Sequence, residues 1–328
     1  MVAVAGSVLV VARSDPPQQL APTREQAGPE FDFPGARRPD RYRSVDASGV
    51  RLAVWEWGEA DAPPVLLAHG GFDFAGTFDT FAPIIADAGY RVVSWDQRGH
   101  GDSSKGHLYS WASDLRDAAA VLESTGAVSL PVIGHSKGGA LMLQLANALP
   151  HRVSRLVNID GLPSRRSWPD VPDHQRTRMV NGEVAAWLDH RRAAAGKIRR
   201  PGTIDELAER RSRMNTRLGH DWLSHLVRIG GYEAPDGWRW KIDPAMRMGG
   251  FGPWRPEWSM SLLPALGMPV LCLLGLELEV MGWGTRPEDI EPHLPPNGRL
   301  VSLDGLGHFL HIEDPARVAS LTLEHLAS

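Results

Sequence analysis

Six short apolar runs most constrain the fold of this 328-residue chain. They have the length and nearly continuous hydrophobicity of strands buried on both faces, and they lie at residues 63–70, 90–96, 130–135, 153–160, 269–275 and 299–305. Stretches of helical periodicity fall between most of them, at residues 78–89, 109–126, 137–150, 285–294 and 313–327. This alternation predicts an α/β fold whose mostly parallel sheet has helices on both faces.

Two alternating stretches precede these runs. RYRSV at 41–45 and RLAVWEW at 51–57 place polar and apolar residues in turn, which predicts an antiparallel pair of strands at one edge of the sheet. Together with the six runs, they predict an eight-stranded sheet in a core formed by residues 41–161 and 262–328.

A long interval without a buried-strand pattern separates the sixth predicted strand from the seventh. Residues 162–261 instead contain helical patterns at 181–196 and 203–215, which predict a helical cap inserted after strand 6. We expect one or two of its tryptophans to line an apolar pocket that faces the sheet. The tryptophans of this interval are Trp168, Trp187, Trp222, Trp238, Trp240, Trp254 and Trp258.

Residues 1–40 are rich in proline and polar groups, which predicts a flexible N-terminal arm that docks on the body through Phe31 and Phe33. The apolar start lacks the basic leader and the cleavage site of a signal peptide. No apolar run reaches the roughly 18 residues of a membrane helix. We therefore expect a cytoplasmic protein without a membrane span.

The net charge and the motifs of the chain restrict the classes of ligand and macromolecule that we expect it to bind. The net charge of −4 argues against a nucleic-acid-binding protein, which would carry a basic excess. There is no phosphate loop and no dinucleotide fingerprint, so no cofactor is expected. His308 and His311 lack further ligands nearby, so no metal site is expected either. The one cysteine, Cys272, lies in an apolar run and is predicted to be a buried thiol. The expected partner is a small-molecule substrate.

The stretch VIGHSKGGALM at 132–142 places one serine between glycines where a predicted strand becomes a helix. A serine hydroxyl needs a base, an acid that orients the base, and donors for the oxyanion. A tight strand-to-helix turn lifts the hydroxyl out of the sheet, and its crowding requires glycine two residues before and two residues after. Gly134 and Gly138 hold these positions, so Ser136 is the candidate nucleophile.

Three more motifs stand in the same order and spacing as in a known family: HGGFDFAGTF at 69–78, SWDQRGHGDSS at 94–104 and GLGHFLHIEDP at 305–315. With the serine turn, they make the chain resemble the α/β-hydrolase superfamily from about residue 41 to the end, apart from much of the cap. TIDELAERRSRMN and GWRWKIDPAMR in the cap are similar to the serine-hydrolase-like branch. The polar residues of the second motif are assigned to the architecture of its turn, namely Asp96, Arg98, His100 and Asp102.

The resemblance implies a role for each motif. Ser136 is the nucleophile, and His308 is the general base that later protonates the leaving group. The backbone N–H groups of Gly71 and Lys137 form the oxyanion hole, with Phe72 as the alternative to Gly71. Lys137 departs from the smaller or apolar residue that often follows the nucleophile, and its charge either tunes the oxyanion or reaches solvent.

The acid of the triad stays open between three carboxylates. The resemblance places an aspartate where this chain has Leu278, with Glu277 and Glu279 on either side. Some members of the superfamily take the acid from the end of the preceding strand, which here is Asp160. We favour Asp160, then Glu277, then Glu279.

These assignments predict a cofactor-independent serine hydrolase that cleaves a carboxylic ester or lactone of a small apolar or aromatic substrate through an acyl-enzyme. One alternative is a carbon–carbon bond hydrolase of a diketone, or perhaloperoxidase-like side chemistry, on the same triad. Another is a ligand-binding, receptor-like protein with weak turnover. Dehalogenase and epoxide hydrolase chemistry is disfavoured, because those relatives use a carboxylate where Ser136 stands.

Overall fold

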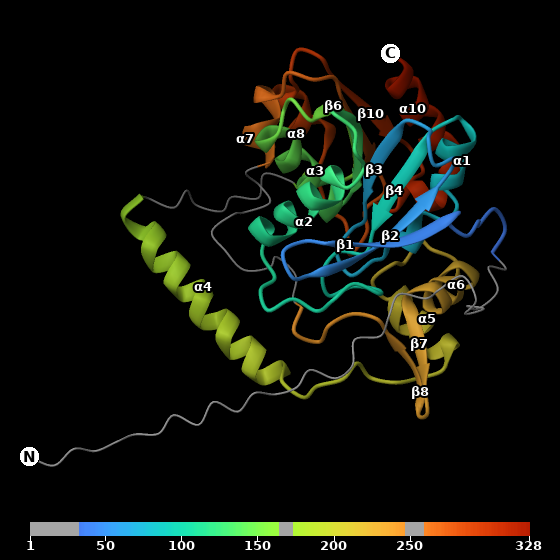
Figure 1. Cartoon of the computed structure of the whole chain (residues 1–328), viewed down its shortest axis with the longest axis vertical. Helices are drawn as coiled ribbons and strands as arrows, with labels where there is room; N and C mark the ends of the chain where they lie inside the picture. Colours follow the sequence, from blue (N-terminus) through green and yellow to red (C-terminus); the bar gives the residue numbers. More distant parts are fainter. Residues whose placement is uncertain (1–32, 164–172, 247–258) are drawn as a thin grey trace, which may run out of the picture.

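The computed structural model of the chain describes residues 33–163, 173–246 and 259–328. Eight strands form one sheet in the order β1-β2-β4-β3-β5-β6-β9-β10 (Figure 1). They are β1 (Arg41–Asp46), β2 (Arg51–Trp57), β3 (Pro64–Ala68), β4 (Arg91–Trp95), β5 (Leu130–His135), β6 (Val153–Ile159), β9 (Val270–Gly275) and β10 (Gly298–Leu303). Each stretch that predicts a strand overlaps one of them, with ends that differ by at most two residues.

The strands pair antiparallel at one edge and parallel elsewhere. β2 is antiparallel to both β1 and β4, and the other neighbours in the sheet are parallel. The expected eight-stranded, mostly parallel sheet is therefore confirmed. The register of β3 and β5 sets Leu66 opposite Val132 and Ala68 opposite Gly134. The loops that follow these two strands consequently start side by side.

Helices cover both faces of the sheet. Alternate residues of β3 enter two separate apolar clusters, one with α2 and α3 and the other with α1 and α10. The core helices are α1 (Ala82–Asp87), α2 (Trp111–Glu123), α3 (Lys137–Ala148), α7 (Ser259–Leu262), α8 (Pro287–Ile290), α9 (Leu310–Glu313) and α10 (Pro315–Ala327), with 3-10 turns η1 (Ala75–Phe78), η3 (Leu263–Ala265) and η4 (Glu291–His293).

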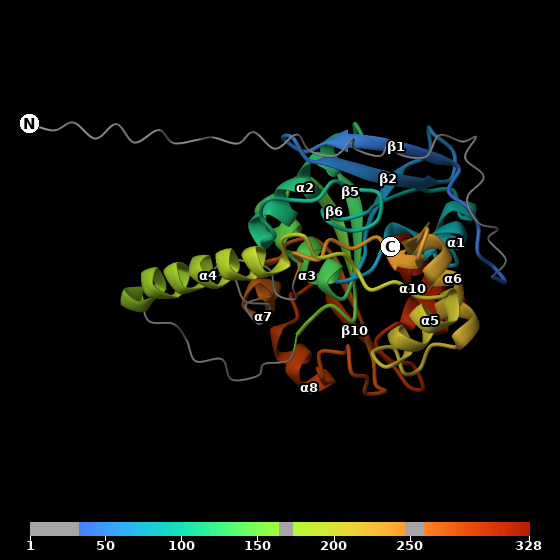
Figure 2. The same ribbon diagram turned by 90° about the horizontal axis from the view of Figure 1, so that it is seen from below.

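The segment inserted between β6 and β9 contains helices and one hairpin. Its described elements are α4 (Asp173–Ala194), α5 (Ile204–Ser212), α6 (His220–Gly230), β7 (Gly231–Ala234) and β8 (Gly237–Trp240). α5, α6 and the hairpin lie together beside the sheet, whereas α4 extends away from it (Figures 1 and 2). α4 and α5 confirm the expected helical patterns. The hairpin was not expected, because its strands of four residues are too short to show a periodicity.

Three of the described tryptophans of the inserted segment belong to one apolar cluster or pack against it. Trp222 is buried in an apolar cluster with α5 and α6, and Trp238 and Trp240 pack against that cluster. The face of Trp187 lies 5.2 Å from the Arg191 guanidinium. A tryptophan-lined pocket stays a prediction, and Trp168, Trp254 and Trp258 lie outside the described residues.

Residues 33–40, the last part of the expected arm, contact the body. The backbone N–H of Arg37 donates to the carbonyl of Asp79 at 2.9 Å, and the Trp57 indole donates to the carbonyl of Arg37 at 2.9 Å. The Phe33 ring stacks on His225 with 5.5 Å between centroids. Docking through Phe33 is therefore as expected, and Phe31 lies outside the described residues.

Three expectations concern what the fold contains. Cys272 is fully buried in β9, and burial raises the pKa of its thiol to about 12, as expected of an unreactive cysteine. Across residues 33–163, 173–246 and 259–328, no helix combines the length and hydropathy needed to cross a membrane. The same ranges contain no group of three or more histidine, cysteine or acidic side chains arranged to hold a metal ion.

Candidate active site

Ser136 lies in the sharp turn between β5 and α3. Its backbone has φ of 52° and ψ of −122°, a strained combination for a residue other than glycine. A Cβ atom on Gly134 would lie 2.3 Å from the carbonyl oxygen of Gly138, and one on Gly138 would lie 2.2 Å from that of Ala68. Both positions therefore require glycine, and the turn holds the serine clear of the sheet as the motif predicts.

Ser136, His308 and Asp160 come together at the carboxyl ends of their strands. His308 Nε2 lies 2.9 Å from Ser136 Oγ, and His308 Nδ1 is hydrogen-bonded to Asp160 Oδ2. The serine follows β5, the aspartate follows β6 and the histidine follows β10. Asp160 has a φ of 44°, so its backbone turns sharply at the end of the strand. The three side chains form a continuous hydrogen-bonded series in the order expected of a nucleophile, a base and an acid.

The two alternative acids lie elsewhere. Glu277 is exposed, and its backbone N–H donates to the carbonyl of Leu306 at 3.0 Å. Glu279 is close to His308, but its Oε2 accepts the backbone N–H of that residue at 2.6 Å instead of reaching the ring. Of the three candidates, Asp160 is therefore the carboxylate that the structure brings to His308 Nδ1.

The backbone of His308 is held on both sides. Glu279 binds its N–H, and Nε2 of His135 donates to its carbonyl oxygen at 2.8 Å. His135, the residue before Ser136, thus connects the serine turn to the loop that carries His308. The preceding N–H, that of Gly307, donates to Glu313 Oε1 at 2.9 Å. The position of the imidazole is consequently fixed by groups that do not belong to the triad.

Two backbone N–H groups are placed to bind an oxyanion. A Cβ atom on Gly70 would lie 3.2 Å from Ser136 Cβ, so the loop after β3 packs directly against the serine. The N–H groups of Gly71 and Lys137 have no protein acceptor among the described residues. The N–H of Phe72 donates to His100 Nε2 at 3.1 Å. The geometry therefore favours Gly71 over Phe72 as the partner of Lys137.

Two arginines of the inserted segment bind the loops that carry these groups. Arg211 Nη1 donates to the carbonyl of Phe72 at 3.0 Å, next to the Gly71 donor. Arg217 donates to the carbonyl of Gly305 at 2.6 Å and forms an ion pair with Glu313 at 2.9 Å. The sequence does not predict either of these contacts, because each depends on where the inserted segment lies relative to the core.

Comparisons with known proteins agree with this geometry. A profile described as the alpha/beta hydrolase fold matches residues 63–188. The chain has the α/β-hydrolase fold. The thioesterase domain from the curacin biosynthetic pathway has a TM-score of 0.72 and 22% identity, over 86% of this chain and 99% of that domain. At this identity the likeness shows the fold alone.

Curated relatives match this chain over part of their length. Epoxide hydrolase A of Mycobacterium tuberculosis is 35% identical over 147 residues, which are 43% of this chain and 44% of the relative. A serine hydrolase-like protein of Dictyostelium discoideum is 33% identical over 119 residues, 34% of this chain and 33% of the relative. The chain thus matches less than half the length of each of these two relatives.

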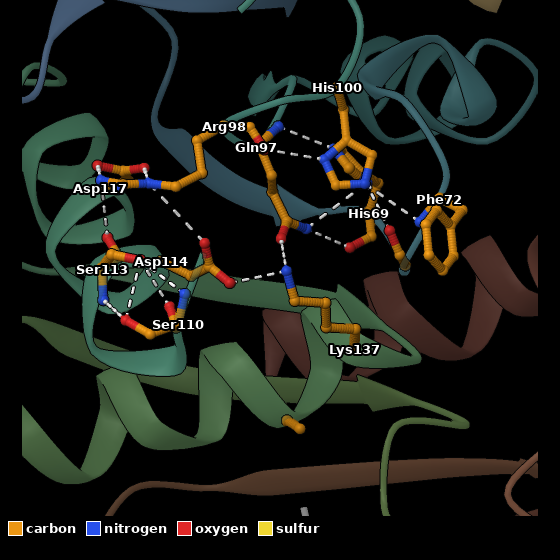
Figure 3. A network of polar contacts seen from close by, with 12 residues as sticks. His69, Phe72, Gln97, Arg98, His100, Ser110, Ser113, Asp114, Asp117 and Lys137 are labelled. Atoms are coloured by element: carbon orange, nitrogen blue, oxygen red, sulfur yellow. Dashed lines mark hydrogen bonds and ion pairs between the residues drawn. The ribbon is translucent and has the colours of Figure 1, made fainter. Parts of the chain in front are cut away.

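A buried polar network surrounds Lys137, the residue after Ser136 (Figure 3). Lys137 Nζ lies 2.7 Å from Asp114 Oδ2 and 2.9 Å from Gln97 Oε1. Asp114 belongs to α2, and Arg98 beside it forms a two-pronged ion pair with Asp117, with both distances 2.6 Å. The lysine side chain therefore turns back into the protein. Sequence carries no signal for this, since Asp114 lies 23 residues before Lys137.

Four further histidines under the site are held neutral. Burial lowers the pKa of His69 and His311 to about 3, and it lowers the pKa values of His100 and His135 well below the usual range. His311 packs against Phe78 with 4.9 Å between ring centroids, and neither of its nitrogens has a hydrogen-bond partner among the described residues. The rings of His69, His100 and His135 are neutral hydrogen-bond partners of nearby backbone groups, and none of the four rings adds a positive charge near Ser136 and His308.

Replacing His311 with leucine is expected to make unfolding less sensitive to acid. An unfolded histidine binds a proton near pH 6.5, whereas the buried ring of His311 does so only near pH 3. The unfolded state therefore holds the extra proton between these values, and the ring destabilises the fold as the pH falls. From pH 7 to pH 5 this loss is about 2 kcal/mol. Urea unfolding of the parent and the variant at both pH values measures it.

Other groups whose titration changes the stability are present in both the parent and the variant, so they drop out of the difference in the free energy of unfolding. Burial raises the pKa of Asp96 to about 7, so this carboxyl favours the folded state increasingly as the pH falls toward 4. Asp96 is present in both proteins, and the difference between them reports His311 alone. If both lose the same free energy of unfolding between pH 7 and pH 5, the ring does not titrate as its burial implies.

Proposed function

We propose that this protein is a serine hydrolase that cleaves a carboxylic ester or lactone of a small apolar or aromatic substrate through an acyl-enzyme. The observation that carries the proposal is the series Asp160–His308–Ser136, with hydrogen bonds at both nitrogens of the imidazole. The two backbone N–H groups beside Ser136 supply the expected oxyanion hole. The serine hydrolase-like relative supports hydrolysis through a serine as the reaction class.

The mechanism follows from the protonation of the ring. Asp160 accepts a hydrogen bond from the N–H at Nδ1, which keeps the ring proton on that nitrogen and leaves the Nε2 lone pair facing Ser136 Oγ. Ser136 Oγ attacks the substrate carbonyl carbon while its proton passes to Nε2, and the new oxyanion accepts hydrogen bonds from the N–H groups of Gly71 and Lys137. Collapse expels the alcohol, which takes the proton from Nε2. Water then attacks the acyl-enzyme by the same proton route and restores Ser136.

Apolar walls support the proposed substrate class. Phe72 follows the Gly71 donor and Phe309 follows the His308 base, and both belong to one apolar cluster with residues of the inserted segment, Trp238 among them. We propose that residues 162–261 form a cap over the core of residues 41–161 and 262–328, with residues 1–40 as an arm. A cap of this kind would limit the site to small, largely apolar acyl and alcohol groups.

The similarity to an epoxide hydrolase does not favour epoxide opening here. A carboxylate that opens an epoxide gives an ester, which water can hydrolyse to regenerate the enzyme. Ser136 would give an ether, which the same machinery cannot hydrolyse. The nucleophile therefore supports acyl transfer, although the matched region is shared with Epoxide hydrolase A.

Labelling with a fluorophosphonate and turnover of a panel of p-nitrophenyl esters and aromatic lactones test the proposal. We expect the parent to label stoichiometrically and to hydrolyse short or aromatic acyl esters, because His308 activates Ser136. The Ser136→Ala variant should do neither, with kcat lower by about six orders of magnitude, as expected when a triad nucleophile is removed.

A matched control is Ser94→Ala, which changes a buried serine in β4 away from the triad. It should label and turn over like the parent. A parent that labels but hydrolyses no ester or lactone would transfer support to carbon–carbon bond hydrolysis. A parent that does not label would support a receptor-like protein.

A further inference from the structure

We propose that the side chain of Lys137 positions the Gly71 N–H donor of the oxyanion hole through Gln97 and His69. Because the N–H of Lys137 is itself the other expected donor, one residue would order both halves of the hole. The inference rests on the proposed function, since it concerns the same site. Lys137 is a positioning residue here, because its ammonium group acts through other side chains.

The first step is the contact between Lys137 and Gln97 (Figure 3). The lysine side chain is 22% exposed, and its ammonium lies 2.7 Å from Asp114 Oδ2 and 2.9 Å from Gln97 Oε1. An ammonium group can only donate, so it must face the amide oxygen of Gln97. The amide nitrogen then faces the backbone carbonyl of His69, to which it donates at 2.6 Å.

The second step fixes the protonation of His69. The backbone N–H of Gln97 donates to His69 Nε2 at 2.9 Å, so this nitrogen carries the lone pair. The proton of the neutral ring is then on Nδ1, which lies 2.7 Å from the carbonyl oxygen of Gly70. Burial keeps the ring neutral, with a pKa of about 3. Gln97 thus binds His69 at both its ring and its backbone.

The third step connects the position of the Gly70 carbonyl to the direction of the Gly71 N–H donor. The carbonyl of Gly70 and the N–H of Gly71 belong to one planar trans peptide group, so they point in opposite directions. A hydrogen bond that holds the Gly70 oxygen against His69 therefore fixes the direction of the Gly71 N–H. Hydrogen bonds in series also polarise one another. An oxyanion hole depends on donors that are in place before the reaction.

The surroundings of Lys137 favour positioning over binding of substrate. Its ammonium is engaged by a carboxylate and an amide, and it lies 5.8 Å from the centre of the Trp111 ring. The Asp114 carboxylate that holds it is buried and also lies 4.0 Å from Arg98. A substrate anion would have to displace Asp114 from this pair, whereas the network needs no rearrangement to act on the loop.

The test is the kinetics of Lys137→Met, which keeps the aliphatic stem and removes the ammonium. We expect kcat to fall about ten- to a hundredfold, which is a part of the effect of losing one oxyanion donor, while KM stays within about twofold. The affinity for an aryl trifluoromethyl ketone, which forms a tetrahedral adduct with Ser136, should fall by the same factor as kcat. If Lys137 had a purely structural role, the Lys137→Met variant would have a lower melting temperature, but its kcat and its inhibitor affinity would not fall by the same factor.

A double-mutant cycle tests the route. Gln97→Met should lower kcat to a similar extent, and Lys137→Met combined with Gln97→Met should be no slower than the slower single variant. The matched control is Lys241→Met, which breaks a lysine–aspartate pair of 2.9 Å with both side chains 25% exposed, away from Gln97. It should leave kcat and the inhibitor affinity unchanged.

The outcomes separate this inference from the proposed function. An active parent whose Lys137→Met variant keeps its kcat, or raises KM alone, overturns the inference and leaves the serine hydrolase proposal standing. If the loss of kcat in the double variant is the product of the two single losses, the route through Gln97 is overturned. A parent that neither labels nor turns over an ester overturns both proposals.

Discussion

The Asp160→Asn variant is expected to lose about three to four orders of magnitude in kcat with little change in KM, as expected when the acid of such a triad is replaced. The carboxylate can only accept from His308 Nδ1, so it keeps the Nε2 lone pair facing Ser136. An asparagine amide can donate to Nδ1, which moves the ring proton to Nε2 and removes the base. Steady-state hydrolysis of a p-nitrophenyl ester measures the loss.

Two glutamate variants are the controls. Glu277→Gln should match the parent, because that side chain is exposed. Glu279→Gln should lose no more than about tenfold, since a glutamine oxygen can still accept the backbone N–H of His308. A collapse of kcat in Glu279→Gln with full activity in Asp160→Asn would make the glutamate the acid, contrary to the geometry.

Gly138→Ala is expected to destabilise the protein by at least about 3 kcal/mol and to abolish turnover. The added methyl would lie 2.2 Å from the carbonyl oxygen of Ala68 and 2.6 Å from that of His69. These are backbone atoms, so relief requires β3 and the serine turn to separate. Because that separation also moves both oxyanion donors, folding and activity should fail together. Urea unfolding and ester hydrolysis measure the two losses.

Gly182→Ala is the matched control. Gly182 lies in α4 with nothing within 4 Å of an added methyl, and alanine is a better helix former than glycine by up to about 1 kcal/mol. This variant should be as stable as the parent or slightly more stable, with unchanged turnover. A tolerated Gly138→Ala would show that the turn has room the structure does not indicate.

The fold was predictable because its signals are local. Each buried strand is one apolar run, and the serine turn combines a strand end, two obligatory glycines and a helix start within eleven residues. Such features depend on neighbours in the chain, so they can be read without tertiary structure. The β7–β8 hairpin lacks such a signal, since its strands are stabilised by their placement beside α5 and α6.

The carboxylate of the proposed triad could not be chosen from the sequence alone. Asp160 and Glu279 both lie within hydrogen-bonding distance of His308, one at the ring and the other at the backbone. Which of them meets the ring depends on the turn after β6, where Asp160 takes a positive φ, and on the path of the loop after β9. Neither is visible in the sequence. The partners of Lys137 are hidden for the same reason, because they come from other elements.

The two arginine contacts have a consequence for redesign. Arg211 and Arg217 lie six residues apart, and each binds a carbonyl in a different loop of the proposed active site. A chimera that takes its inserted segment from a relative would therefore exchange two anchors of the reaction centre along with the pocket wall. Grafts that retain residues 211–217 of this chain should preserve rate while they change selectivity, and this stretch is the natural boundary for such exchanges.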